Sequence, residues 1–134
     1  MNRALRTALG LTTLLVPALA GCAAASRPDV EAVVSGSYEA YTRQDGAAAC
    51  ALLAPATRAE LEQSAGVPYA AGLLDEKLPR TGRVTASEVY GDQAQVRLDG
   101  DTAFAAQFPD GWKVVAVGCV RRPQRPYDCT VEAG

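Results

Sequence analysis

The sequence predicts a single α+β domain in which N-terminal helices pack on a curved antiparallel β-meander. Two observations favour this fold. Apolar residues recur every three or four positions up to about residue 77, as in amphipathic helices, and alternate with polar residues after Gly82, as in strands. The strand-like runs are separated by turns of two or three residues, which only antiparallel neighbours can use. A length of 134 residues suits one domain.

The first 21 residues have the layout of a secretory signal peptide. Arg3 and Arg6 give a positive start, and residues 8–20 are uncharged and mostly apolar. This run is shorter than the roughly 20 residues that a transmembrane helix needs, and Pro17 weakens it further as a helix. We therefore expect residues 1–21 to be a signal peptide that is removed from the mature chain.

The sequence Leu19-Ala20-Gly21-Cys22 resembles the lipobox of bacterial lipoproteins. The resemblance implies cleavage between Gly21 and Cys22, diacylation of the Cys22 thiol, and a lipid anchor on the extracytoplasmic face of the cell membrane. Two acyl chains make a stable anchor, whereas one is marginal. The alternative is an ordinary secretory peptide followed by a coincidental cysteine. With the lipobox interpretation, residues 22–27 are the lipidated N-terminus and a short tether, and residues 28–134 form the domain. The five residues that link Cys22 to the domain reach roughly 17 Å at most.

The composition excludes several classes of function. The chain has no His, which removes Ser-His-Asp and Cys-His catalysis and HExxH zinc sites. Loss of the signal peptide lowers the count of Lys and Arg from 13 to 11 against 15 Asp and Glu, a formal charge of −4. We therefore expect no nucleic-acid partner, and we expect lipid rather than attraction to anionic head groups to hold the chain at the membrane. No catalytic set, metal site or cofactor is predicted.

Four helices are expected before residue 82. The first begins near Pro28, with Asp29 in its first turn, and carries one apolar stripe. The stripe consists of Val30, Val33, Val34, Ser37, Tyr38 and Tyr41. Asp45 is expected to cap the second helix. The later helices are expected at residues 46–53, 55–64 and 70–77.

Four strands are expected after residue 82. The alternating runs cover residues 83–90, 93–98, 102–108 and 112–120, and each of the three intervening turns contains Gly and Asp. The last run closes the meander, so residues 120–128 are expected to form a loop.

Three further stretches carry a resemblance to a known family. The stretch Cys50–Leu61 (CALLAPATRAEL) and the closing Gly111–Cys119 (GWKVVAVGC) with Pro126–Cys129 (PYDC) resemble small uncharacterised lipoproteins of high-GC Gram-positive bacteria. Those proteins are in turn similar to the NTF2-like or cystatin-like α+β cone. The resemblance covers nearly all of the mature chain and implies the cone fold without implying an activity.

Three cysteines remain once Cys22 is lipidated. Cys119 and Cys129 flank the expected loop, and disulfides persist outside the cytoplasm, so this pair is favoured as a disulfide. Cys50 lies among alanines on a predicted helix, which favours a small buried residue over the alternative of a reactive thiol.

Three sets of residues are candidates for function, each with a plainer alternative. Aromatic residues that would line a pocket between helices and sheet, or simply fill the core, are Tyr38, Tyr41, Tyr69, Tyr90 and Trp112. Basic residues that would form a partner patch, or a solvated hairpin tip, are Arg121, Arg122 and Arg125. The acids nearest the apolar stripes are Glu39 and Glu88, which act as acid or base only if buried.

The sequence therefore favours a monomeric, non-catalytic accessory module of the cell envelope, anchored by acylated Cys22. Its partner would be an envelope protein or component bound through the outer face of the sheet or the arginine loop. One alternative is a carrier or sensor that holds a small ligand in the cone cavity. Another is a carboxylate-based enzyme of the NTF2-like type, which needs Glu39 or Glu88 inside that cavity beside a tyrosine.

Overall fold

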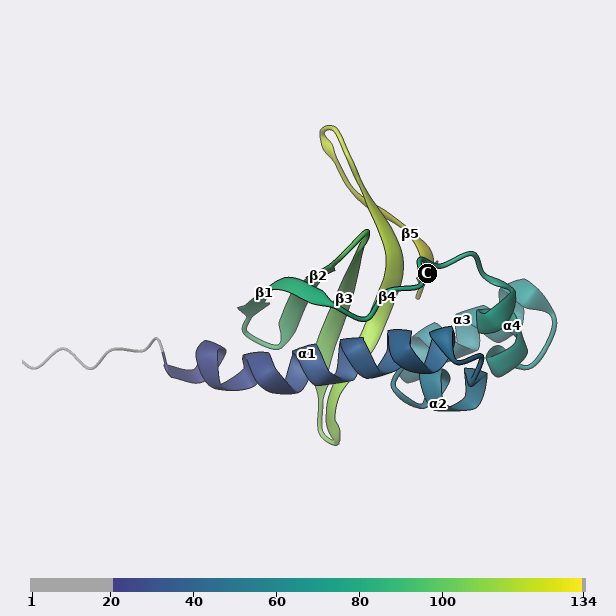
Figure 1. The fold of residues 1–134 in the computed structure, drawn as a ribbon, viewed down its shortest axis with the longest axis horizontal. Helices are drawn as coiled ribbons and strands as arrows, with labels where there is room; N and C mark the ends of the chain where they lie inside the picture. Colours follow the sequence, from purple (N-terminus) through teal and green to yellow (C-terminus); the bar gives the residue numbers. More distant parts are fainter. Residues whose placement is uncertain (1–20, 134) are drawn as a thin grey trace, which may run out of the picture.

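The predicted α+β fold is confirmed by the computed structural model, which describes the backbone of residues 21–133 and the side chains from residue 26 onward except that of Arg125. Four helices are followed by a five-stranded antiparallel sheet (Figure 1). The helices are α1 (Gly21–Thr42), α2 (Gly46–Ala51), α3 (Pro55–Ala65) and α4 (Tyr69–Asp75). The strands are β1 (Val84–Tyr90), β2 (Gln93–Leu98), β3 (Asp101–Phe108), β4 (Gly111–Arg122) and β5 (Arg125–Glu132), and they lie in chain order across the sheet.

The N-terminal segment differs from expectation in one respect. Residues 1–20 of the predicted signal peptide lie outside the part of the chain that the structure describes. The short tether expected at residues 22–27 is helical and continuous with α1, which contains Pro28. Three consecutive alanines at 23–25 favour this extension because alanine has the highest helix propensity. Five helical residues advance about 8 Å, half the reach of an extended tether. Within residues 21–133, no helix is both long and apolar enough to span a bilayer.

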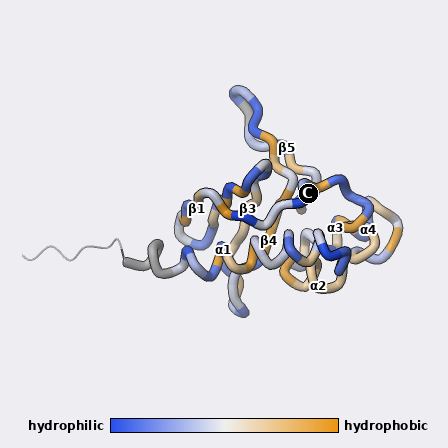
Figure 2. Tube along the Cα trace, in the orientation of Figure 1, coloured by the Kyte–Doolittle hydropathy of each residue, from blue (hydrophilic) through white to orange (hydrophobic). Residues whose placement is uncertain are grey.

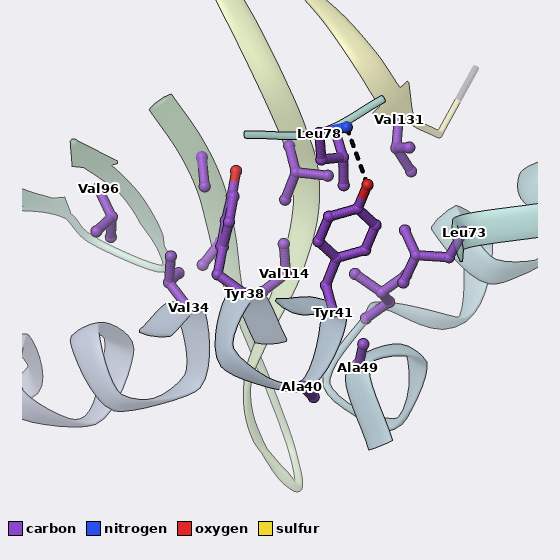
Figure 3. Close-up of a cluster of buried hydrophobic side chains, with 14 of the residues drawn as sticks. Val34, Tyr38, Ala40, Tyr41, Ala49, Leu73, Leu78, Val96, Val114 and Val131 are labelled. Atoms are coloured by element: carbon purple, nitrogen blue, oxygen red, sulfur yellow. Dashed lines mark hydrogen bonds between the residues drawn. The ribbon is translucent and has the colours of Figure 1, made fainter. Parts of the chain in front are cut away.

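The apolar stripe of α1 forms the core, as predicted. Val30, Val34 and Tyr38 are buried against the sheet, and Figure 3 shows Tyr38 and Tyr41 rising from α1 into the space between helix and strands. The Tyr41 hydroxyl donates to the Glu76 carbonyl at 2.5 Å and accepts from the Leu78 N–H at 3.2 Å. The stripe therefore packs against the sheet and, through the Tyr41 hydroxyl, also fixes the segment after α4.

The short helices are attached to β4 by backbone hydrogen bonds. The Asp45 carboxylate caps α2 by accepting from the Ala48 N–H at 3.0 Å, as predicted. After α2, the Val114 N–H donates to the Leu52 carbonyl at 2.9 Å and the Ala54 N–H donates to the Val114 carbonyl at 2.8 Å. This bridge fixes where α3 begins relative to the sheet.

The C-terminal loop expected at residues 120–128 is instead a two-stranded ribbon. Strand β4 continues to Arg122, the chain turns at Pro123 and Gln124, and β5 returns antiparallel to β4. Both prolines of this segment are compatible with the ribbon, because Pro123 lies at the turn and Pro126 lies on an edge strand, where a missing N–H is tolerated. The predicted disulfide joins Cys119 and Cys129, which face each other across the two strands with Cα atoms 3.9 Å apart. We call residues 119–129 the β4–β5 ribbon.

A carboxylate from β3 holds the base of this ribbon. Gly118 has a φ of +66°, and its N–H and that of Cys119 each donate to the Asp101 carboxylate at 3.1 Å. The Tyr38 hydroxyl donates to the same carboxylate. Burial, followed by the bond to Asp101, raises the pKa of Tyr38, so the phenol stays a neutral donor. A Cβ on Gly118 would meet the Thr130 hydroxyl at 2.7 Å, so both φ and space require glycine.

We expect Asp101→Asn to lower the free energy of unfolding by about 2 kcal/mol, because an amide nitrogen in place of one oxygen faces N–H donors that it cannot accept from. Urea unfolding followed by circular dichroism measures the change. Asp99→Asn is the matched control, since Asp99 is exposed and only weakly paired with Arg83 at 4.0 Å. Equal midpoints for the two variants would contradict the role of Asp101.

Reducing the Cys119–Cys129 disulfide should lower the free energy of unfolding by about 2–3 kcal/mol, because the bond closes a loop of 10 residues in the unfolded chain. Urea midpoints of a Cys22→Ser chain with and without reductant measure this. In the Cys119→Ser, Cys129→Ser double variant the reductant should change nothing. A wild-type midpoint that does not respond to reductant would contradict the expectation.

Candidate functional site

The predicted pocket residues do not come together around a cavity. Tyr38, Tyr41 and Trp112 are buried in the core, whereas Tyr90 is 64% exposed on the far side of the sheet. Tyr69 is half-buried with the Arg58 guanidinium 5.9 Å from its ring centre. The space lined by Tyr38 and Tyr41 measures about 10 Å³, which holds one water. The packed interior therefore counts against a small-ligand carrier.

The two predicted carboxylates are on the surface. The side chains of Glu39 and Glu88 are 61% and 45% exposed, and they pair with Arg43 at 3.9 Å and Arg97 at 3.3 Å respectively. The acid that meets a buried tyrosine is Asp101, which sequence reasoning placed in a turn. No local pattern distinguishes it from Asp99, because its donors come from α1 and β4. Asp101 acts as a structural acceptor, and the acid expected for the enzyme alternative is not in the interior.

Cys50 is buried, as expected, and its thiol donates to the Tyr69 carbonyl at 3.6 Å. Burial raises the pKa of this thiol to about 11, against a smaller opposing effect of Arg58. The thiol is therefore protonated at neutral pH, and a protonated, buried thiol is a poor nucleophile.

The strongest candidate surface is the face of the sheet opposite α1, which we call the outer face. Alternation along β2 points Ala94, Val96 and Leu98 toward α1, where all three are buried. Gln93, Gln95 and Arg97 therefore point to the outer face. The cross-strand register puts Gln95 between Glu88 of β1 and Phe104 of β3, so this face gathers side chains from several strands.

Six side chains on this face form two interacting groups of three, placed side by side by the cross-strand pair Glu88 and Gln95, and together we call them the outer-face cluster. Its members are Glu88, Tyr90, Gln95, Arg97, Phe104 and Tyr127. Glu88 accepts from the Tyr90 hydroxyl and from the Arg97 guanidinium, the latter at 3.3 Å. The Gln95 amide donates to the Tyr127 hydroxyl at 2.7 Å, and the Phe104 and Tyr127 rings meet edge to face at 5.0 Å.

These contacts fix the positions of the side chains in the cluster. The hydrogen bond to Glu88 is the main cause that raises the pKa of Tyr90, so its phenol is a neutral hydrogen-bonding group at neutral pH. Tyr, Phe and Arg are the residue types enriched in protein interfaces and their hot spots. The sequence pointed to Glu88 and Tyr90 as candidates but not to the whole cluster, because Tyr127 belongs to β5, a strand that was not predicted.

The predicted arginine patch lies at the far end of the β4–β5 ribbon. Figure 1 shows the ribbon projecting from the body, and Figure 2 shows its end as hydrophilic. Arg121 is exposed, Arg122 pairs with Asp128, and the backbones of Arg122 and Arg125 face each other across the turn. The two described arginine side chains line an open recess beside the turn. The Cys119–Cys129 disulfide closes the base of this patch.

Comparisons with protein-family models, with curated proteins and with solved structures found no significant match to this chain. The resemblance to NTF2-like or cystatin-like cones and to small lipoproteins therefore stays a prediction. The case for function depends on the residues of the two surfaces described above.

Proposed function

We propose that this protein is a lipid-anchored module on the extracytoplasmic face of the cell membrane, and that it binds an envelope partner through the outer-face cluster. The observation that carries this proposal is the cluster itself. Tyr90 and Arg97 remain exposed while their hydrogen bonds to Glu88 hold them in place.

The anchor is supported by the sequence around Cys22. A charged start, an uncharged apolar run and the lipobox-like Leu19-Ala20-Gly21-Cys22 follow one another at the spacing of a lipoprotein signal. In the mature chain Cys22 would be the first residue, and the folded domain follows it directly through α1. The module would then act close to the membrane surface.

Binding at the surface is supported by the packed interior. The interior space near Tyr41 holds about one water, so a ligand would have to bind outside the core. Side chains that are already ordered lose less entropy on binding, and this saves about 0.5–1.5 kcal/mol for each long side chain. The cluster also offers both charges and three rings, which suits a protein partner better than a simple ion.

The anchor is tested by Cys22→Ala. We expect this variant to move from the membrane fraction to the soluble fraction and to lose incorporation of radiolabelled palmitate, because the acylated thiol is absent. Cys50→Ala is the matched control and should stay in the membrane fraction. A Cys22→Ala chain that remains in washed membranes would contradict the lipid anchor.

The binding surface is tested by photo-crosslinking in intact cells. A photoreactive residue at Gln93, on the outer face, should form one discrete adduct, whereas the same residue at exposed Gln63 on α3 should not. Reversing the cluster's cation with Arg97→Glu should remove the adduct.

The matched control is Arg83→Glu, which reverses an exposed arginine outside the cluster and should leave the adduct unchanged. Equal adducts from Gln93 and Gln63, or an adduct that persists with Arg97→Glu, would overturn the outer-face cluster as the binding surface.

A further inference from the structure

The β4–β5 ribbon separates charge within the mature chain. Residues 120–128 contain three arginines and one aspartate, a formal charge of +2, while the rest of the mature chain has 8 basic and 14 acidic residues, a charge of −6. The total of −4 argues against attraction to an anionic surface. Charges are screened over about 8 Å at physiological salt, however, so a projecting tip acts largely by its own charge.

The ribbon projects because its outer part is paired only within itself. Strand β3 pairs with β4 over Gly111–Ala116, and β5 pairs with β4 over Ala116–Arg122. The disulfide and the two N–H bonds to Asp101 fix the base of the ribbon. The tip is thus held away from the acidic body in a defined direction.

The ribbon tip and the lipid-proximal end of α1 lie on one side of the molecule. If a straight line is drawn in Figure 1 from the N-terminal end of α1 to the ribbon tip, every described element lies on the same side of it. A flat surface placed along this line and perpendicular to the view touches both points without cutting through the described part of the chain. A membrane that holds Cys22 can therefore reach the tip as well.

The chemistry of the tip suits a phospholipid surface. A guanidinium binds phosphate through two parallel hydrogen bonds, and Arg121 is exposed to do so. Val120, next to it, is 66% exposed, and basic residues beside apolar ones are typical of segments at the membrane interface. Pro123 and Pro126 limit the backbone freedom that would be lost on contact.

We propose that the tip of the β4–β5 ribbon is a second membrane contact, in which Arg121 and Arg122 bind the phosphate groups of anionic phospholipids in the membrane that anchors the chain. This inference rests on the lipid anchor of the proposed function. Because the anchor already holds the chain at the surface, the tip meets the headgroups at a high effective concentration, and a weak contact is enough to orient the domain.

The experiment uses the mature chain, oxidised and coupled through Cys22 to a maleimide lipid in vesicles. Cys22 is the thiol available for coupling, because Cys119 and Cys129 are bonded to each other and Cys50 is buried. A tryptophan replaces Pro123 at the tip or, as the control site, exposed Gln63 on α3. The native Trp112 is buried, so quenching by brominated lipids beyond that of the unsubstituted chain reports contact of the introduced tryptophan with the bilayer.

We expect Pro123→Trp to be quenched in equimolar phosphatidylglycerol and phosphatidylcholine, and not in pure phosphatidylcholine. High salt and the added charge reversals Arg121→Glu and Arg122→Glu should each remove the quenching, while Arg121→Lys should retain most of it. Both arginine side chains are exposed, so circular dichroism should show an unchanged fold.

Equal quenching at the two tryptophan sites, equal quenching in the two lipid mixtures, or quenching that survives charge reversal would overturn the proposal. So would a photo-adduct to a protein from Gln124 in cells combined with no quenching in vesicles, since the arginines would then serve a protein partner. Chemical coupling makes these results independent of natural lipidation and of the outer-face adduct, so failure here is distinguishable from failure of the proposed function.

Discussion

The carboxylate of Asp101 is the point at which the separate parts of this fold are joined. It accepts from the Tyr38 hydroxyl on α1 and from the N–H groups of Gly118 and Cys119 on β4, while itself belonging to β3. A partly buried charge is tolerated when several donors surround it. One side chain thus connects the N-terminal helix to the strand that continues into the ribbon. The direction of the ribbon and the position of β5 both depend on it.

The parts of the fold that sequence predicts well are those set by local periodicity. The 3.6-residue stripe of α1, the cap at Asp45, the alternation of β2 and the short turns act within a few residues of one another, and the structure contains all of them. The missed strand β5 has a different origin. Its pairing depends on the bend at Gly118 and on the disulfide. Neither is a local pattern, so the expectation that the meander closes near residue 120 put a loop where tertiary pairing imposes a strand.

The candidate site was less predictable than the fold for the same reason. Glu88 and Tyr90 stand out as an acid and an aromatic residue near apolar runs. The hydrogen bond from Arg97 of β2 to Glu88, and the contact of Tyr127 of β5 with neighbouring Gln95, exist only once the strands have paired. Of the residues predicted to face a pocket, the two on strands were divided by parity, Trp112 to the core and Tyr90 to the surface. Parity is visible in the sequence only when the strand and its register are both known. Cross-strand pairing therefore determines which residues form the outer-face cluster.

The continuity of α1 from residue 22 to Tyr41 has a mechanical consequence. The helix is 22 residues long, about 33 Å, and its buried stripe is part of the core, so its N-terminal end and the sheet form one rigid unit. With the proposed lipid at Cys22, a change of tilt of this helix at the bilayer would carry the sheet with it. Membrane thickness or curvature would then be transmitted as a rotation of the domain rather than absorbed by a slack linker.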